Sequence, residues 1–146
     1  MKTTFKIIVA LLIIFGATIL FSHLKSFNTE KAARYVTENA APRSKTCCAW
    51  YVMRAMHAGG CLISIYPAWA YKYILPLHNF EKVDKQNYRP QKGDIVVIEN
   101  SKAHFWGHIA MYNGKIWVSD FKQRNLIVHS DYLDDGCEYA IYRRDR

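Results

Sequence analysis

The sequence predicts an α+β fold in which helices near the N-terminus pack on a small antiparallel sheet. Two observations lead to this prediction. Apolar residues recur at helical spacing as far as residue 74, whereas short apolar runs typical of strands follow residue 90. Asn113-Gly114 then lies between two such runs, and this dipeptide is the strongest short signal for a β-hairpin. At 146 residues, the chain has room for one domain with a single core and a targeting segment.

The first 27 residues differ in composition from the rest. An uncharged run at 7–21 follows Lys2 and Lys6, and the next charge is Lys25. The run is long enough for the apolar core of a signal peptide and reaches the lower limit for a membrane span. We therefore expect residues 1–27 to be a signal or membrane-anchor segment, so that the protein is exported and either secreted or anchored facing the periplasm or the extracellular side. No cysteine lies in or just after the run, which excludes a bacterial lipoprotein anchor.

Residues 28–146 are expected to form the single domain. A first helix should begin at Asn28 and end before Pro42. Ser44 is the expected N-cap of a second helix, which runs from Lys45 to about His57 and stops at the glycines that follow. A short helix is expected at 68–74, and strands are expected at 95–98, 109–112, 115–119, 126–129 and 139–142.

The formal charge of +8 suits an anionic partner, such as cell wall or a membrane surface. Nucleic acid is disfavoured because the basic residues are scattered and no nucleic-acid motif is present. A zinc site is disfavoured because the four cysteines include no Cys-x-x-Cys pair and the adjacent Cys47 and Cys48 have the wrong spacing for one. The sequence gives no reason to expect a cofactor.

Cys48 is the candidate nucleophile. It lies in the first turn of the second helix, where the positive end of the helix dipole and unpaired backbone N–H groups favour the thiolate. Cys47 is its immediate neighbour, but adjacent helical residues point to different sides, so only one of the two can face a cleft.

His108 is the candidate base, because Gly107 leaves space beside it and the buried strand that follows would fix its ring. His104 is the alternative. Asp120 is the candidate orienting acid: across a two-residue hairpin, the end of the second strand returns beside the start of the first, next to His108. Asp94 is the rival acid, although its place in a Lys-Gly-Asp turn suggests that it shapes the turn.

Four segments in this order resemble the NlpC/P60 and CHAP superfamily of papain-like cysteine peptidases. They are Cys48-Ala-Trp-Tyr-Val, Pro90-x-Lys-Gly-Asp-Ile-Val-Val, Gly107-His-Ile-Ala-Met-Tyr-Asn-Gly and Trp117-Val-Ser-Asp-Phe. They look most similar to the peptidoglycan amidase effectors of type VI secretion. The resemblance implies a papain-like fold and hydrolysis of amide bonds in the peptide stems or crosslinks of bacterial cell wall. It also implies Cys48 as nucleophile, His108 as base, Asp120 as acid, and peptidoglycan and an immunity protein as partners.

Two other functions fit the same residues. A related thiol acyltransferase would use the same nucleophile with an acceptor other than water, and a non-catalytic wall-binding domain would have Cys48 in a disulfide. For the active enzyme, we expect Cys61 and Cys137 to form the disulfide, because each directly follows a glycine at the end of an element. A bridge from Cys47 to either of them is the alternative.

Overall fold

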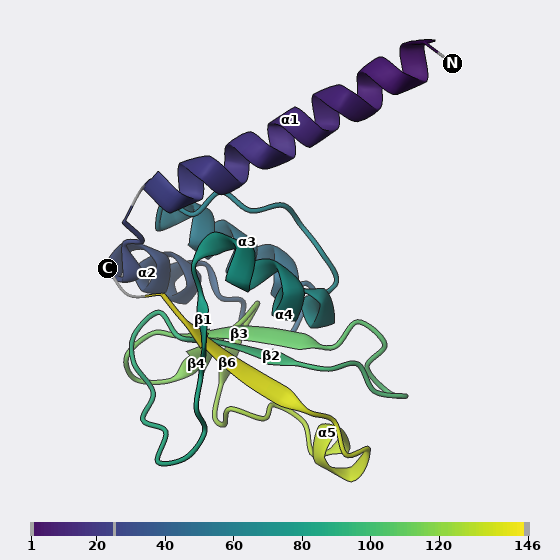
Figure 1. The fold of residues 1–146 in the computed structure, drawn as a ribbon. Coiled ribbons are helices and arrows are strands. Elements are labelled where there is room, and N and C mark those ends of the chain that lie inside the picture. Colours follow the sequence, from purple (N-terminus) through teal and green to yellow (C-terminus); the bar gives the residue numbers. More distant parts are fainter. Residues whose placement is uncertain (1, 25, 145–146) are drawn as a thin grey trace.

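The computed structural model describes residues 2–24 and 26–144, and it confirms the α+β class (Figure 1). The long helices come first: α1 (Lys2–Leu24), α2 (Thr29–Asn39) and α3 (Cys48–Ala58). Short helical segments follow: η1 (Ala68–Ala70), α4 (Tyr71–Ile74) and η2 (Leu75–His78). The strands are β1 (Glu81–Val83), β2 (Ile95–Ile98), β3 (His108–Tyr112), β4 (Trp117–Val118), β5 (Lys122–Gln123) and β6 (Tyr139–Arg143), with α5 (Asp131–Asp134) between the last two.

The six strands form one antiparallel sheet in the order β1-β6-β2-β3-β4-β5. Strand β2 is buried along its whole length because both faces of the sheet are covered. Ile95 and Val97 belong to the core on the helix side, whereas Val96 and Ile98 belong to a second apolar cluster on the opposite face. This alternation follows from the two-residue period of a strand.

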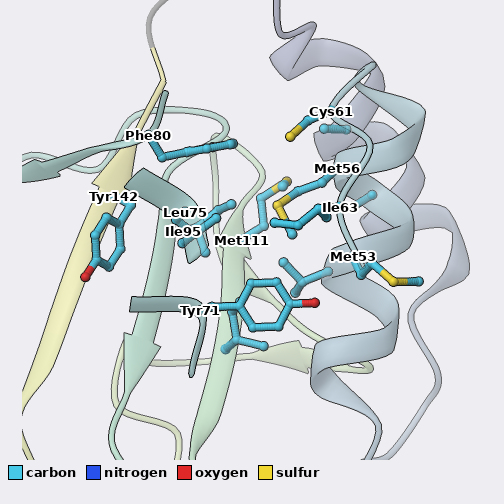
Figure 2. Packing of buried hydrophobic residues seen from close by; sticks show 14 of the residues in the cluster. Met53, Met56, Cys61, Ile63, Tyr71, Leu75, Phe80, Ile95, Met111 and Tyr142 are labelled. Carbon is cyan, nitrogen blue, oxygen red and sulfur yellow. The ribbon is translucent and has the colours of Figure 1, made fainter. Parts of the chain in front are cut away.

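The larger core lies between the sheet and α2, α3 and the short helices. Figure 2 shows Met56 of α3 close to Ile63, with Ile95 and Met111 of the sheet on the other side of the core. The opposite face has no long helix. Tyr132 of α5 and the irregular segment around residues 126–128 cover it instead.

The first expected helix is confirmed as α2. Asn28 is its N-cap, and its side-chain oxygen accepts a hydrogen bond from the Lys31 amide at 2.9 Å. The helix ends at Asn39, three residues before Pro42. The short helix expected at 68–74 is also present, but Pro76 does not end the helical path. It lies in the first turn of η2, where a missing N–H costs little.

The expected strand at 126–129 is absent. Leu126, Ile127 and Val128 instead pack as partly buried side chains on the second apolar cluster, so this apolar run covers the sheet rather than extending it. The hairpin also differs from the prediction. Tyr112 pairs with Trp117, which leaves a four-residue connection in place of a two-residue turn. The Asn113 side chain explains this, because its oxygen accepts hydrogen bonds from the backbone amides of residues 115 and 116 at 2.9 Å.

The N-terminal segment forms α1, which extends away from the rest of the fold (Figure 1). Among the described residues, no helix combines the length and apolar content that crossing a membrane requires. Met1 and Lys25 of the expected targeting segment lie outside the described residues.

The boundary expected after Phe27 cuts through the core. Phe27 is 2% exposed, and its ring lies 5.2 Å from that of Phe80 in an edge-on arrangement. A β-carbon on Gly59, at the end of α3, would lie 2.4 Å from the Phe27 ring. Phe27 therefore belongs to the folded domain.

Candidate active site

Cys48 is the first residue of α3 and is half-buried against the sheet. The helix starts three residues later than expected, because Cys47 rather than Ser44 occupies the N-cap position, where its side chain makes no capping hydrogen bond. The backbone amides of Ala49 and Ile109 both interact with the Cys48 sulfur. Since Ile109 directly follows His108 in β3, the fold brings the candidate nucleophile next to the strand that carries the candidate base.

The free thiol is not activated by its place at the helix start. The pKa of Cys48 is raised to about 11, mainly by burial, and the nearby Asp120 charge contributes in the same direction. The backbone amides of Ile109 and Ala49 lower the pKa but do not outweigh the burial. The expectation of a dipole-stabilised thiolate is therefore wrong for the free protein, in which Cys48 is a neutral thiol near pH 7.

His108 is the first residue of β3 and is 7% exposed. Gly107 precedes it with φ +67°, and a β-carbon there would lie 2.5 Å from the carbonyl oxygen of Ile98. Only glycine allows this close approach of two backbones, so Gly107 fixes the entry of the chain into β3. Pairing of β3 with β2, where His108 opposes Ile98, then holds the histidine backbone.

His108 is a neutral imidazole near pH 7. Its pKa is lowered to about 4, mainly by burial, and the neighbouring His129 and His104 contribute in the same direction. The Asp120 charge raises the pKa, as does a hydrogen bond with Gln123, but neither offsets the burial. The candidate pair is therefore a thiol and a neutral imidazole, with the proton on the sulfur.

Gln123, rather than Asp120, contacts the histidine ring. The Gln123 Nε2 lies 2.5 Å from His108 Nε2 and donates to Ser119 Oγ at 2.9 Å. Gln123 is 3% exposed, and its Oε1 is buried without a hydrogen-bond partner. The sequence gives no signal for this residue: Gln123 ends a two-residue strand and lies between Lys122 and Arg124, where the local pattern indicates a solvated turn.

Asp120 is buried, 1% exposed, and its carboxylate binds the loop that leads into α3. Its Oδ2 accepts hydrogen bonds from the Lys45 amide at 2.5 Å, the Ser44 hydroxyl at 3.2 Å and the Cys47 amide at 3.4 Å. Its Oδ1 accepts from the Ser119 hydroxyl at 3.0 Å. The predicted proximity of Asp120 to His108 is present as an electrostatic effect on the ring, but the ring's hydrogen bond comes from Gln123.

His104, the alternative base, lies in an aromatic stack. Its ring is 4.9 Å from that of His129 and 4.7 Å from that of Tyr132, and its Nε2 is 3.5 Å from the Asp131 carboxylate. This stack lies close to the site, since it contributes to the pKa of His108 and Cys48 raises the pKa of Tyr132. Among the described residues, no group of three His, Cys, Asp or Glu side chains is placed to hold a metal ion.

Asp94, the rival acid, has a structural role, as its place in a turn suggested. It is fully buried and receives hydrogen bonds from the Tyr88 hydroxyl at 2.6 Å and from two nitrogens of Arg143 at 2.7 and 2.8 Å. It also accepts from the Gln91 amide at 2.8 Å. These contacts tie the turn before β2 to β6.

The expected disulfide between Cys61 and Cys137 is wrong for this structure. None of the four cysteines, all of which lie within the described residues, is in a disulfide. Cys61 is buried in the core on the helix side, whereas Cys137 packs on the cluster at the opposite face of the sheet, so the sheet separates them. Cys48 is likewise outside any disulfide in this structure.

Comparisons with known proteins agree with this arrangement. Residues 33–121, which include Cys48, His108 and Asp120, match the model of the CHAP domain. The native type VI effector–immunity complex Tae3–Tai3 from Ralstonia pickettii contains a similar chain, with 33% identity and a TM-score of 0.75 over 82% of this chain and 100% of that one. The selenomethionine form of the same complex gives 34% identity and a TM-score of 0.70 over 77% and 98%. No curated protein matches the sequence.

The family match spans more than half of the chain, and the fold match covers the whole of the effector chain in the native complex. Both agree with the resemblance that the motifs indicated. The chain belongs to the CHAP domain family.

Proposed function

We propose that this protein is a cysteine-dependent hydrolase that cleaves amide bonds in the peptide stems or crosslinks of bacterial peptidoglycan. The observation that supports this most directly is the contact between the Cys48 sulfur and the backbone of Ile109, next to His108. A helix-borne thiol beside a strand-borne imidazole suits acyl transfer through a covalent thioester. Similarity to a type VI effector supports the cell wall as the target.

The two pKa values define the first step. With the pKa of Cys48 near 11 and that of His108 near 4, the proton stays on the sulfur until a substrate carbonyl is in place. As the sulfur attacks the carbonyl carbon, His108 takes the thiol proton, and a C–S bond forms while the carbonyl π bond opens. His108 then gives the proton to the leaving nitrogen as the C–N bond breaks. Attack by water on the thioester releases the acid and restores the thiol.

Gln123 is the group we propose to orient the ring in this step. A half-turn of its amide would place the buried, unpartnered Oε1 against the ring at Nε2, where it could accept an N–H hydrogen bond. His108 Nδ1 would then be unprotonated and able to accept the thiol proton. Gln123 contributes no charge, which is consistent with a ring that remains neutral in the free protein.

The decisive experiment is digestion of purified peptidoglycan, with mass spectrometry of the released termini. We expect the full-length protein to release new amine and carboxyl ends at one type of amide bond. Cys48→Ala should release none while keeping the same circular dichroism spectrum, because alanine is tolerated at a helix start. Cys47→Ala is the matched control and should retain substantial activity. Activity in Cys48→Ala, or none in Cys47→Ala, would show that the nucleophile is wrongly assigned.

Export and a protein partner complete the proposal. We propose that the apolar segment within α1 directs export, since the CHAP match begins only at residue 33 and the segment contributes mostly exposed apolar side chains. A fusion of residues 1–26 to an alkaline phosphatase reporter, active only outside the cytoplasm, tests this. The similar effector chain is found with its immunity protein, so we also propose that an immunity protein binds this chain.

A further inference from the structure

The loop that joins α2 to α3 is hydrogen-bonded at its start to the turn that follows β4. The Ala41 amide donates to the Asp120 carbonyl at 2.7 Å, and Ala41 forms a parallel bridge with Phe121. The loop side chains from Ser44 to Cys47 are exposed. Contacts at its base, rather than burial, therefore hold this loop in place.

The Asp120 carboxylate gathers the donors of this loop on one oxygen. Oδ2 accepts from the amides of Lys45 and Cys47 and from the Ser44 hydroxyl, at 2.5, 3.4 and 3.2 Å. Such a cluster of N–H and O–H donors around a buried carboxylate is strong because the acceptor is charged. Ser44 does not cap the helix that begins at Cys48; its oxygen accepts instead from the Thr46 amide at 3.2 Å, within the loop.

The backbone between these donors is strained. Thr46 has φ +58°, a conformation that a β-branched residue rarely adopts and that holds only where its surroundings enforce it. The two amides on either side of Thr46 are the ones that point at Asp120 Oδ2. The carboxylate therefore supports the strained turn that ends at Cys47, one residue before the nucleophile.

By hydrogen bonds, the same carboxylate is linked to the candidate base through other side chains. Asp120 Oδ1 accepts from Ser119, the Ser119 hydroxyl oxygen lies 2.9 Å from the Gln123 amide group, and that group contacts the His108 ring. Direct contacts to the loop before Cys48 thus outnumber the single indirect route to His108.

From this geometry we propose that Asp120 is a positioning residue for the nucleophile: its carboxylate holds the 44–47 loop in its strained turn and thereby sets where α3 begins and where Cys48 lies. The proposal rests on the proposed function for the role of Cys48, but the loop contacts can be tested without substrate. In this proposal, Asp120 positions Cys48 rather than orienting the ring of His108.

The test compares Asp120→Ala with Gln123→Ala in the full-length chain, by amide hydrogen exchange and by the ring nitrogen spectra of His108. In Asp120→Ala, we expect exchange of the Lys45 and Cys47 amides to become at least about tenfold faster, because their charged acceptor is gone. The His108 ring tautomer should stay as in the parent. In Gln123→Ala, the ring spectrum should change while the two loop amides exchange at the parental rate.

Reactivity of Cys48 gives a second readout. The rate of its alkylation by iodoacetamide, followed by peptide mass spectrometry in a Cys47→Ala background, should change in Asp120→Ala. If Asp120→Ala does not fold, Asp120→Asn and Ser44→Ala replace it; Ser44→Ala removes one donor and should raise exchange of the loop amides about threefold.

Parental exchange at Lys45 and Cys47 together with an altered His108 tautomer in the Asp120 variants would overturn the proposal and make Asp120 the orienting acid. Neither the amide exchange nor the His108 ring spectra require peptidoglycan. A parent protein that fails to cleave cell wall would therefore refute the proposed function, but it would not change the outcome of these two measurements.

Discussion

The loop that precedes Cys48 and the strand that carries His108 are held in place in opposite ways. The loop at 44–47 is exposed and strained at Thr46, and its hydrogen bonds converge on one buried carboxylate. His108 is buried in a strand that is paired along its length with β2, and a glycine fixes the chain before it. The candidate base is therefore positioned by the sheet itself, whereas the position of the candidate nucleophile depends on a few polar contacts that a single substitution can remove.

The largest expected effect comes from removing the base. His108→Ala should lower kcat/KM by about 1,000-fold or more, since members of a catalytic unit fail together. Steady-state assays on a purified wall fragment measure this. His104→Ala should keep considerably more activity, because its ring is engaged in the stack with His129 and Tyr132. Near-parental activity in His108→Ala would transfer the role of base to His104.

The second prediction tests the far end of the nucleophile helix. Phe27→Ala should lower the free energy of unfolding by about 3–5 kcal/mol, because it leaves a cavity between Phe80 and Gly59 beside the end of α3. Urea unfolding of the full-length chain measures the change. Phe105→Ala is the matched control: its side chain is 66% exposed, so its effect should stay within about 0.5 kcal/mol. Equal effects of the two substitutions would place Phe27 outside the core.

The third prediction concerns pH and the buried base. Burial lowers the pKa of His108 to about 4 from its ordinary value of 6.5, so between these values the unfolded chain binds a proton that the folded protein does not. The free energy of unfolding should therefore fall as the pH drops from 6.5 to about 4, by on the order of 3 kcal/mol. Above pH 6.5 this contribution is fully present.

Urea unfolding at several pH values across that window measures the slope. His108→Gln removes the titrating ring, so most of the slope should disappear in this variant. If the free energy of unfolding of His108→Gln depends on pH as steeply as that of the parent, the pH dependence comes from other groups.

The smallest expected effect comes from changing Gln123, the neutral residue that contacts the His108 ring. Gln123→Ala should lower kcat by about 10- to 100-fold, because the ring loses its orienting contact. Gln123→Glu should restore a hydrogen bond and raise the pKa of His108, which moves the acid limb of the pH profile to higher pH. The exposed Gln86→Ala serves as the control and should behave as the parent does. A pH profile that is unchanged in Gln123→Glu would contradict the proposed contact.

The sequence predicted those features that depend on local pattern. The helices around Asn28 and Cys48, the buried strand at 95–98 and the strand after Gly107 all carry apolar periodicity with a start or stop signal, and all are present. The pairing of a helix cysteine with a strand histidine followed from the same pattern. The comparison with solved effector chains confirmed the family that these motifs indicated.

The groups around the candidate pair could not be predicted in the same way, because they depend on register. A two-residue turn would have paired Tyr112 with Lys115, but the Asn113 side chain holds a longer connection and moves the second strand by two residues. Gln123, which contacts the ring, lies on the next strand, β5, opposite Trp117. The late start of α3 has a related cause: the Lys45 and Cys47 amides, which would lie in the first turn of a helix capped by Ser44, donate instead to the carboxylate of Asp120, a residue distant in sequence.

The position of β6 has a consequence for how the molecule is made. This strand, the last of the chain in sequence, lies between β1 and β2 in the sheet, and its Arg143 pairs with the buried Asp94. The sheet therefore cannot close around β2 until residue 143 has been synthesised, and these non-local pairings form late. A chain that stops before β6 would therefore leave one edge of β2 unpaired and the buried carboxylate of Asp94 without its Arg143 partner.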